Sequence, residues 1–198
     1  MRLIKFASKY PEPQSLLTKR LILRRPQSSD FESWAHLRRS SERFLKPFEP
    51  LWAHDELSRS SYRARLRQQE ADISSGRGLP WFLFSRSSPD QLMGGLTISN
   101  IRRGVADTGT LGYWMGESYA GQGFMSEAVH AICKDCFTTH RLHRIEAATV
   151  LENERSQRLL LNCHFQKEGI ARQYLKIDGN WRDHVLFARL ADDPVPND

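Results

Sequence analysis

The feature that most constrains the fold is a stripe of apolar residues recurring every three or four positions between Met125 and Phe137. This spacing predicts an amphipathic helix whose apolar side must cover another apolar surface. Residues 111–115 (LGYWM), just before it, form a short apolar run that is typical of a strand. We therefore expect a strand, a turn and a helix that packs back on a sheet. The stripe consists of Met125, Ala128, Val129, Ile132, Cys133, Cys136 and Phe137.

Strand and helix signals alternate along the rest of the chain. Three consecutive apolar runs separated by turn residues predict an antiparallel meander. The order of elements predicts a mixed α/β (α+β) sheet of about six to seven strands with helices on both faces. Expected strands cover residues 21–23, 81–85, 92–99, 111–115 and 144–150, with a hairpin over 174–190. Expected helices start near Ser29 or Asp30 and cover 56–74 and 156–162, and 44–52 is expected to be an ordered loop.

Length and composition are those of one soluble domain. The chain has 198 residues, of which 39% are apolar, and no apolar run approaches the roughly 18 residues that cross a bilayer. We expect a single domain over 19–192 with tails at 1–18 and 193–198. Its three cysteines cannot all pair within one chain, which favours a reducing, cytoplasmic location. The net charge of +6 indicates an anionic partner: a nucleotide cofactor, a ribosomal or other nucleic-acid surface, or an acidic polypeptide.

A glycine-bearing turn opens the amphipathic helix. Gly121 and Gly123 let the backbone approach a bulky anion, and the free N–H groups of the first helical turn point toward it. A structural helix entry explains the same glycines equally well. The Gly-Lys-Ser/Thr of a P-loop and the third glycine of a Rossmann unit are both missing, so the two common nucleotide folds are disfavoured.

Several segments together resemble the GCN5-related N-acetyltransferase (GNAT) superfamily. Within it the chain is similar to the RimJ/RimL branch of ribosomal-protein N-acetyltransferases, and the closing stretch is most like the RimJ type. The resemblance implies a mostly antiparallel central sheet, acetyl-CoA as donor, and an N-terminal α-amino group of a ribosomal or other protein as acceptor. The segments are residues 18–24 (TKRLILR), 45–50 (LKPFEP), 94–100 (GGLTISN), 169–175 (GIARQYL) and 178–184 (DGNWRDH).

The resemblance also implies a set of coenzyme-binding residues. The superfamily signature Q/R-x-x-G-x-G/A falls on residues 120–125 (AGQGFM), where Ala120 and Met125 depart from it. Backbone N–H groups there would hold the pyrophosphate, and the pantetheine arm would lie between diverging strands 111–115 and 144–150. The implied cofactor-binding residues are Tyr113, Trp114, Met115, Ala120, Gly121, Gln122, Gly123, Phe124, Met125, Ser126, Asn153 and Ser156.

The same resemblance gives Ser156 the role of general acid toward the departing thiolate. Many relatives use a tyrosine at the place of Leu160, which has no proton to give; alternatively, Ser156 only caps a helix. Gln173 stands where some relatives carry a glutamate, so the general base is open. A free α-amino group has a pKa of about 7.7 to 8.0 and is partly neutral already. Asp183 is the candidate base, with His184 beside it, unless both only stabilise the hairpin.

The acceptor slot is expected at Phe44, Phe48, Glu49 and Trp52, an apolar wall with one carboxylate, although core packing explains these aromatics equally well. The same chemistry on a small-molecule amine stays open as an alternative, as does a basic RNA-associated module with an inactive scaffold. The enzyme is expected to be a monomer or a homodimer. No metal is expected, because the only candidate set, Cys133, Cys136, His140 and His143, places both cysteines on the apolar stripe.

Overall fold

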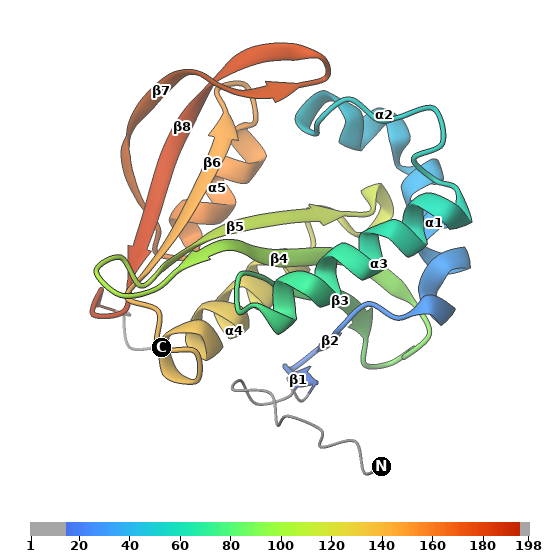
Figure 1. Ribbon diagram of the computed structural model, residues 1–198, viewed down its shortest axis with the longest axis horizontal. Helices are drawn as coiled ribbons and strands as arrows, with labels where there is room; N and C mark the ends of the chain where they lie inside the picture. Colours follow the sequence, from blue (N-terminus) through green and yellow to red (C-terminus); the bar gives the residue numbers. More distant parts are fainter. Residues whose placement is uncertain (1–14, 195–198) are drawn as a thin grey trace, which may run out of the picture.

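The protein forms one twisted eight-stranded sheet in the order β1-β2-β3-β4-β5-β6-β8-β7 (Figure 1). The structure, a computed structural model, describes residues 15–194, so most of both expected tails lies outside the described residues. Neighbouring strands are antiparallel except for β5 and β6. The strands are β1 (Leu16–Leu17), β2 (Leu21–Arg24), β3 (Leu79–Ser85), β4 (Leu92–Arg102), β5 (Thr108–Met115), β6 (Arg144–Val150), β7 (Gln166–Ile177) and β8 (Asn180–Leu190).

The mixed, mostly antiparallel sheet confirms the expected fold class, with one strand more than predicted. The additional strand is β1, which pairs Leu16 with Leu23 of β2 and lies in the segment expected to be a tail. Two residues are too few to show an alternating pattern, so only the pairing with β2 reveals this strand. The meander of β3, β4 and β5 is confirmed, and the predicted hairpin of β7 and β8 is present, but β7 begins at Gln166 rather than near Tyr174.

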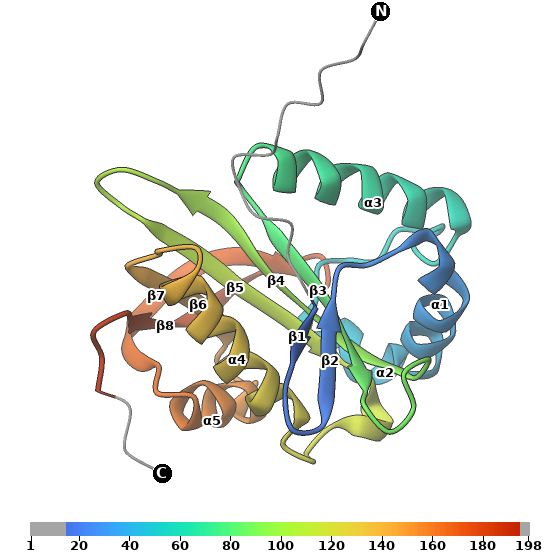
Figure 2. The same cartoon turned by 90° about the horizontal axis from the view of Figure 1, so that it is seen from below.

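Helices cover both faces of the sheet, as expected (Figure 2). Helices α1 (Phe31–Ser40) and α3 (Arg59–Ser74) lie on one face, and α4 (Phe124–Thr138) and α5 (Glu154–Asn162) lie on the other. The segment expected to be an ordered loop, 44–52, instead begins with two short helical turns. The helices are α1 (Phe31–Ser40), α2 (Glu42–Leu45), α3 (Arg59–Ser74), α4 (Phe124–Thr138) and α5 (Glu154–Asn162), with 3-10 turns η1 (Ser28–Asp30), η2 (Lys46–Phe48) and η3 (Glu117–Tyr119).

Strand β3 shows how one sheet serves two cores. Trp81 and Leu83 belong to the cluster under α4, whereas Phe82 and Phe84 belong to the cluster under α1 and α3. All four are buried, because alternate side chains of a central strand enter opposite layers. Arg24, on neighbouring β2, places its guanidinium 4.0 Å from the centre of the Phe84 ring.

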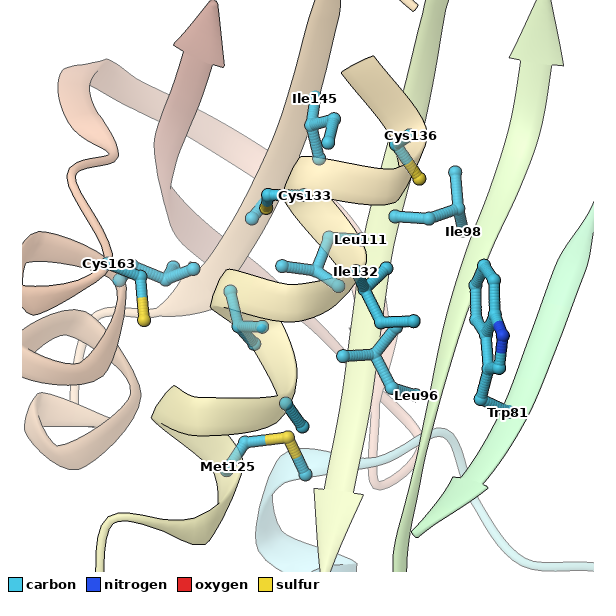
Figure 3. Close-up of a cluster of buried hydrophobic side chains, with 14 of the residues drawn as sticks. Trp81, Leu96, Ile98, Leu111, Met125, Ile132, Cys133, Cys136, Ile145 and Cys163 are labelled. Atoms are coloured by element: carbon cyan, nitrogen blue, oxygen red, sulfur yellow. The ribbon is translucent and has the colours of Figure 1, made fainter. Parts of the chain in front are cut away.

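The predicted apolar stripe of α4 faces the sheet (Figure 3). Cys133 and Cys136 are fully buried in this layer, and burial raises the pKa of the Cys133 thiol to about 12. They therefore pack as small apolar side chains and stay protonated at neutral pH. Within residues 15–194, no three His, Cys, Asp or Glu side chains are grouped so that they could hold a metal ion. In the same range, no helix is both long and apolar enough to span a bilayer.

Candidate active site

A gap opens in the sheet where β5 and β6 part. The two strands pair only from Thr108 with Arg144 to Leu111 with Ala147. Beyond that point β5 stays with β4 up to Met115, while β6 stays with β8 up to Val150 (Figure 1). The expected divergence of these strands is therefore present, and it leaves one edge of β5 without a partner strand.

Hydrogen-bond alternation along β5 fixes which amides face the gap. The N–H of Gly116 donates to the Met93 carbonyl of β4 at 2.9 Å. In an antiparallel pair, alternate residues turn their N–H groups toward the partner strand, so Trp114 also directs its N–H at β4. Tyr113 and Met115 then direct theirs into the gap. Two of the three expected positions thus offer an amide there, and Trp114 does not.

The turn before α4 is a run of amides without acceptors in the described part of the chain. Gly121 and Gly123 have φ angles of 75° and 77°, a left-handed region that favours glycine. Gly123 is the N-cap of α4 and brings no capping side chain. None of the N–H groups of residues 121–126 has an acceptor within the described part of the chain, whereas the Ala120 N–H already donates to Glu117. Open amides at a helix N-terminus fit the diphosphate of a coenzyme A.

Ser156 lies in the first turn of α5 and is joined to β5 across the gap. Its hydroxyl Oγ lies 2.6 Å from the phenolic Oη of Tyr113. The helix is capped by Asn153, whose Oδ1 accepts the Ser156 N–H at 3.1 Å. The capping role that could have explained Ser156 thus belongs to Asn153, and the hydroxyl of Ser156 bonds to Tyr113 instead of capping the helix. Leu160, on the same helix, is fully buried in the core.

The side chain of Tyr113 is a part of the site that the sequence did not reveal. Only its backbone was expected to contribute, because nothing in the sequence pairs it with a residue 43 positions away. Burial raises the pKa of the Tyr113 phenol well above its ordinary value, so it stays protonated. A protonated phenol can donate to Ser156 Oγ and leave the serine proton pointing elsewhere.

For the acetyl transfer that the sequence resemblance implies, we expect Tyr113→Phe to lower kcat about tenfold while the KM for acetyl-CoA changes less than about twofold, since only the orientation of Ser156 is lost. Steady-state kinetics with acetyl-CoA measures both. Tyr62→Phe is the matched control, because it removes a buried hydrogen bond, 2.7 Å to the Gln27 carbonyl, under the opposite face. An equal loss of kcat in both variants would contradict this role of Tyr113.

Asp183 and His184 lie on β8 and both have structural partners. Asp183 Oδ1 accepts the N–H of Gln173 at 2.8 Å, where the φ of Gln173 is 46° and β7 bulges. His184 is buried, with Nδ1 2.9 Å from the Arg182 carbonyl oxygen and its ring 5.7 Å from that of Tyr174. These contacts stabilise the hairpin. That Asp183 acts as a base stays a prediction.

Glu49, the carboxylate expected in the acceptor slot, is paired with Arg38. Arg38 Nη1 donates to Glu49 Oε1 at 3.1 Å, and Trp52 Nε1 donates to Oε2 at 2.7 Å. The guanidinium of Arg38 is buried 4.5 Å from the Trp52 ring centre and 5.1 Å from that of Trp114. The charge of Glu49 is therefore compensated from within the protein, so its contact with an acceptor amine stays a prediction.

The loop around Glu49 also closes the far end of the gap. The Glu49 carbonyl accepts the N–H of Asp178, at the turn between β7 and β8, at 2.9 Å. The ring centre of Phe44 lies 5.7 Å from the guanidinium carbon of Arg155 on α5. Phe48 is 41% exposed, so it leaves apolar surface for a ligand. The structure thus brings the expected acceptor residues to the part of the sheet where β5 and β6 separate.

We expect Glu49→Gln to lower the free energy of unfolding by about 3 kcal/mol, because it leaves the buried guanidinium of Arg38 without a counter-charge. Urea unfolding measures this loss. Glu42→Gln is the control: its partner Lys46 is 40% exposed and the pair is a surface one, so a loss below about 1 kcal/mol is expected. Equal losses would show that the Arg38–Glu49 pair contributes no more than a surface contact.

The amide-lined turn and the diverging strands β5 and β6 fit an acyltransferase that uses a coenzyme A thioester. The family pattern of the acetyltransferase (GNAT) domain matches residues 20–166, and the chain belongs to that family. It is an N-acetyltransferase with acetyl-CoA as its donor.

Known proteins are similar to this chain along nearly its whole length. It is 36% identical over 183 residues to the ribosomal protein uS5-alanine N-acetyltransferase of Escherichia coli, covering 91% of this chain and 93% of that one. The crystal structure of a ribosomal-protein-S5-alanine acetyltransferase from Vibrio fischeri superposes with a TM-score of 0.84 at 30% identity, over 93% of this chain and 100% of that one. RimJ of Mycobacterium smegmatis, in complex with CoA-disulfide, gives a TM-score of 0.83 at 32% identity, over 89% and 84%.

Proposed function

We propose that this enzyme acetylates the N-terminal α-amino group of a ribosomal protein in the cytoplasm. The observation that carries the proposal is the similarity to a uS5-alanine N-acetyltransferase, 36% identity over 91% of this chain, a span too long to leave out residues 44–52 or the turn between β7 and β8. These two segments meet through the hydrogen bond between Asp178 and Glu49. They border the gap at the end where the expected acceptor residues lie, so the alignment covers that region as well as the donor site.

Each part of the gap has a separate task in the proposed mechanism. Acetyl-CoA supplies the activated acetyl group. The N–H groups of residues 121–126 bind its diphosphate, and those of Tyr113 and Met115 donate hydrogen bonds to its polar arm and thioester oxygen. Ser156, oriented by Tyr113, gives a proton to the departing sulfur.

The acceptor needs little help to lose its proton. An α-amino group with a pKa of about 7.7 to 8.0 is partly neutral at cellular pH and can attack directly once it is positioned. A strong general base is therefore not required. This is compatible with the existing bonds of the two carboxylates, from the Gln173 N–H to Asp183 and from Arg38 to Glu49. Asp183 accepts the proton that the amine releases as it attacks, directly or through water, and water returns that proton to Ser156 after the serine has protonated the sulfur.

Labelled acetyl-CoA and ribosomes from a strain without N-terminal acetylation test the acceptor. After incubation, mass spectrometry locates the label. We expect one N-terminal α-amino group to carry it, and a panel of free amino acids, polyamines and aminoglycosides to stay unlabelled. Labelling of a small amine with unlabelled ribosomal proteins would overturn the proposed acceptor, while RNA binding without turnover would overturn the enzymatic role.

A further inference from the structure

Arg20 reaches from the start of β2 to the turn that opens α4, and Figure 2 shows β2 running beside that helix. Its Nη1 donates to the Gln122 carbonyl oxygen at 3.0 Å, and its Nε donates to Glu127 Oε2 at 2.6 Å. The guanidinium lies 4.3 Å from the centre of the Phe124 ring. One side chain thus contacts the turn before the helix, its first residue and its first-turn carboxylate.

The bond to Gln122 fixes the direction of a peptide group in the amide-lined turn. In a planar trans peptide, the carbonyl and the following N–H point in opposite directions. With the Gln122 carbonyl held by Arg20, the N–H of Gly123 points to the side away from Arg20, where it has no protein acceptor. A flipped peptide would instead present a carbonyl oxygen to an incoming anion. Gly123 has no side chain to resist such a flip.

The bond to Glu127 removes an unfavourable charge. A carboxylate in the first turn of α4 would repel a diphosphate bound at the same end of the helix. Glu127 is fully engaged: Thr18 Oγ1 and the Arg20 N–H donate to Oε1 at 2.6 Å and 2.8 Å, and the Arg20 guanidinium binds Oε2. The guanidinium cancels its charge and leaves the positive end of the helix dipole to the ligand.

We propose that Arg20 is a positioning residue for coenzyme binding, which directs the Gln122–Gly123 peptide and neutralises Glu127 so that the turn accepts a diphosphate. The inference rests on the proposed binding of the diphosphate by residues 121–126. It concerns only the part of the donor that carries phosphate, and this restriction makes it testable with a donor that has none.

The experiment compares acetyl-CoA with S-acetylpantetheine, which has the same thioester and arm but no diphosphate. For Arg20→Met we expect the Kd for CoA, by calorimetry, to rise about 30-fold, the worth of one charge-assisted hydrogen bond. The kcat/KM with S-acetylpantetheine should stay within about twofold of the wild-type value, because the proposed role of Arg20 concerns only the diphosphate. In the double variant Arg20→Met with Glu127→Gln, CoA affinity should recover about fivefold as the repulsion disappears.

Thr18→Val is the matched control, because it removes one contact to Glu127, together with the bond from the Leu21 N–H to the same hydroxyl, and leaves the guanidinium in place. Its Kd for CoA should change less than about threefold. Should Arg20→Met unfold, Arg20→Lys provides the same comparison, with an expected loss of about fivefold for CoA only. An unchanged CoA affinity, or equal losses with both thioesters, would overturn the role of Arg20. Wild-type protein that does not bind CoA would instead overturn the proposed diphosphate site itself.

Discussion

Ser156→Ala is expected to lower kcat about 10²-fold and to leave the Kd for CoA within about twofold. The hydroxyl is held 2.6 Å from Tyr113 at the gap, where it can protonate the sulfur as the bond to the acetyl group breaks. A proton given in the transition state affects the rate, and it contributes little to ground-state binding. Stopped-flow detection of the released thiol, together with calorimetry, separates the two quantities.

The control is Ser88→Ala, at an exposed position between β3 and β4 where the hydroxyl has no hydrogen-bond partner in the described chain. It should match the wild type in both kcat and Kd. If Ser156→Ala keeps wild-type turnover, another group protonates the sulfur. If it loses CoA affinity as strongly as it loses turnover, Ser156 serves binding.

Gly123→Val is expected to weaken CoA binding about 10²-fold. A β-branched residue is strained at a φ of 77°, and its Cβ would lie 3.4 Å from Arg20 Nη2. Relief of that strain would turn the adjacent amides away from the ligand, and several charge-assisted hydrogen bonds would be lost together. Calorimetric titration with CoA gives the affinity, and thermal unfolding gives the accompanying loss of stability.

Gly104→Val separates strain from binding. Gly104 has a φ of 76°, and a Cβ there would meet nothing within 4 Å. The two variants should therefore lose similar stability, roughly 1 to 2 kcal/mol, but only Gly123→Val should lose CoA affinity. Equal CoA affinities in the two variants would mean that the turn before α4 does not bind the coenzyme.

Elements with a strong local pattern were predictable from the sequence. The buried stripe of α4 repeats every three or four residues, and β6 was predicted with its observed ends, 144–150. By contrast, β1 is only two residues long, and α2 is only four. Elements this short depend on tertiary contacts, such as burial of Leu45 and the pairing of β1 with β2. Local propensity carries almost no signal for them.

The candidate site likewise has one part that the sequence predicts and another part that only the fold reveals. Gly121 and Gly123 point to the amide-lined turn because a left-handed backbone conformation favours one residue type. The partners of charged and hydroxyl groups are set by the fold: Tyr113 meets Ser156, and Arg20 meets Gln122, only after distant segments pack together. The pairing of Glu49 with Arg38 could not be predicted for the same reason, because nothing in the sequence shows that α1 brings Arg38 to Glu49.

The most direct measurement is to follow the backbone amide resonances of residues 121–126 by NMR while CoA is added, and then pantetheine. Hydrogen bonds from these N–H groups to a diphosphate should move their proton signals downfield with CoA, while pantetheine, which has no phosphate, should leave them in place. CoA that binds elsewhere on the folded protein without moving the Gly121 and Gly123 amides would contradict the account.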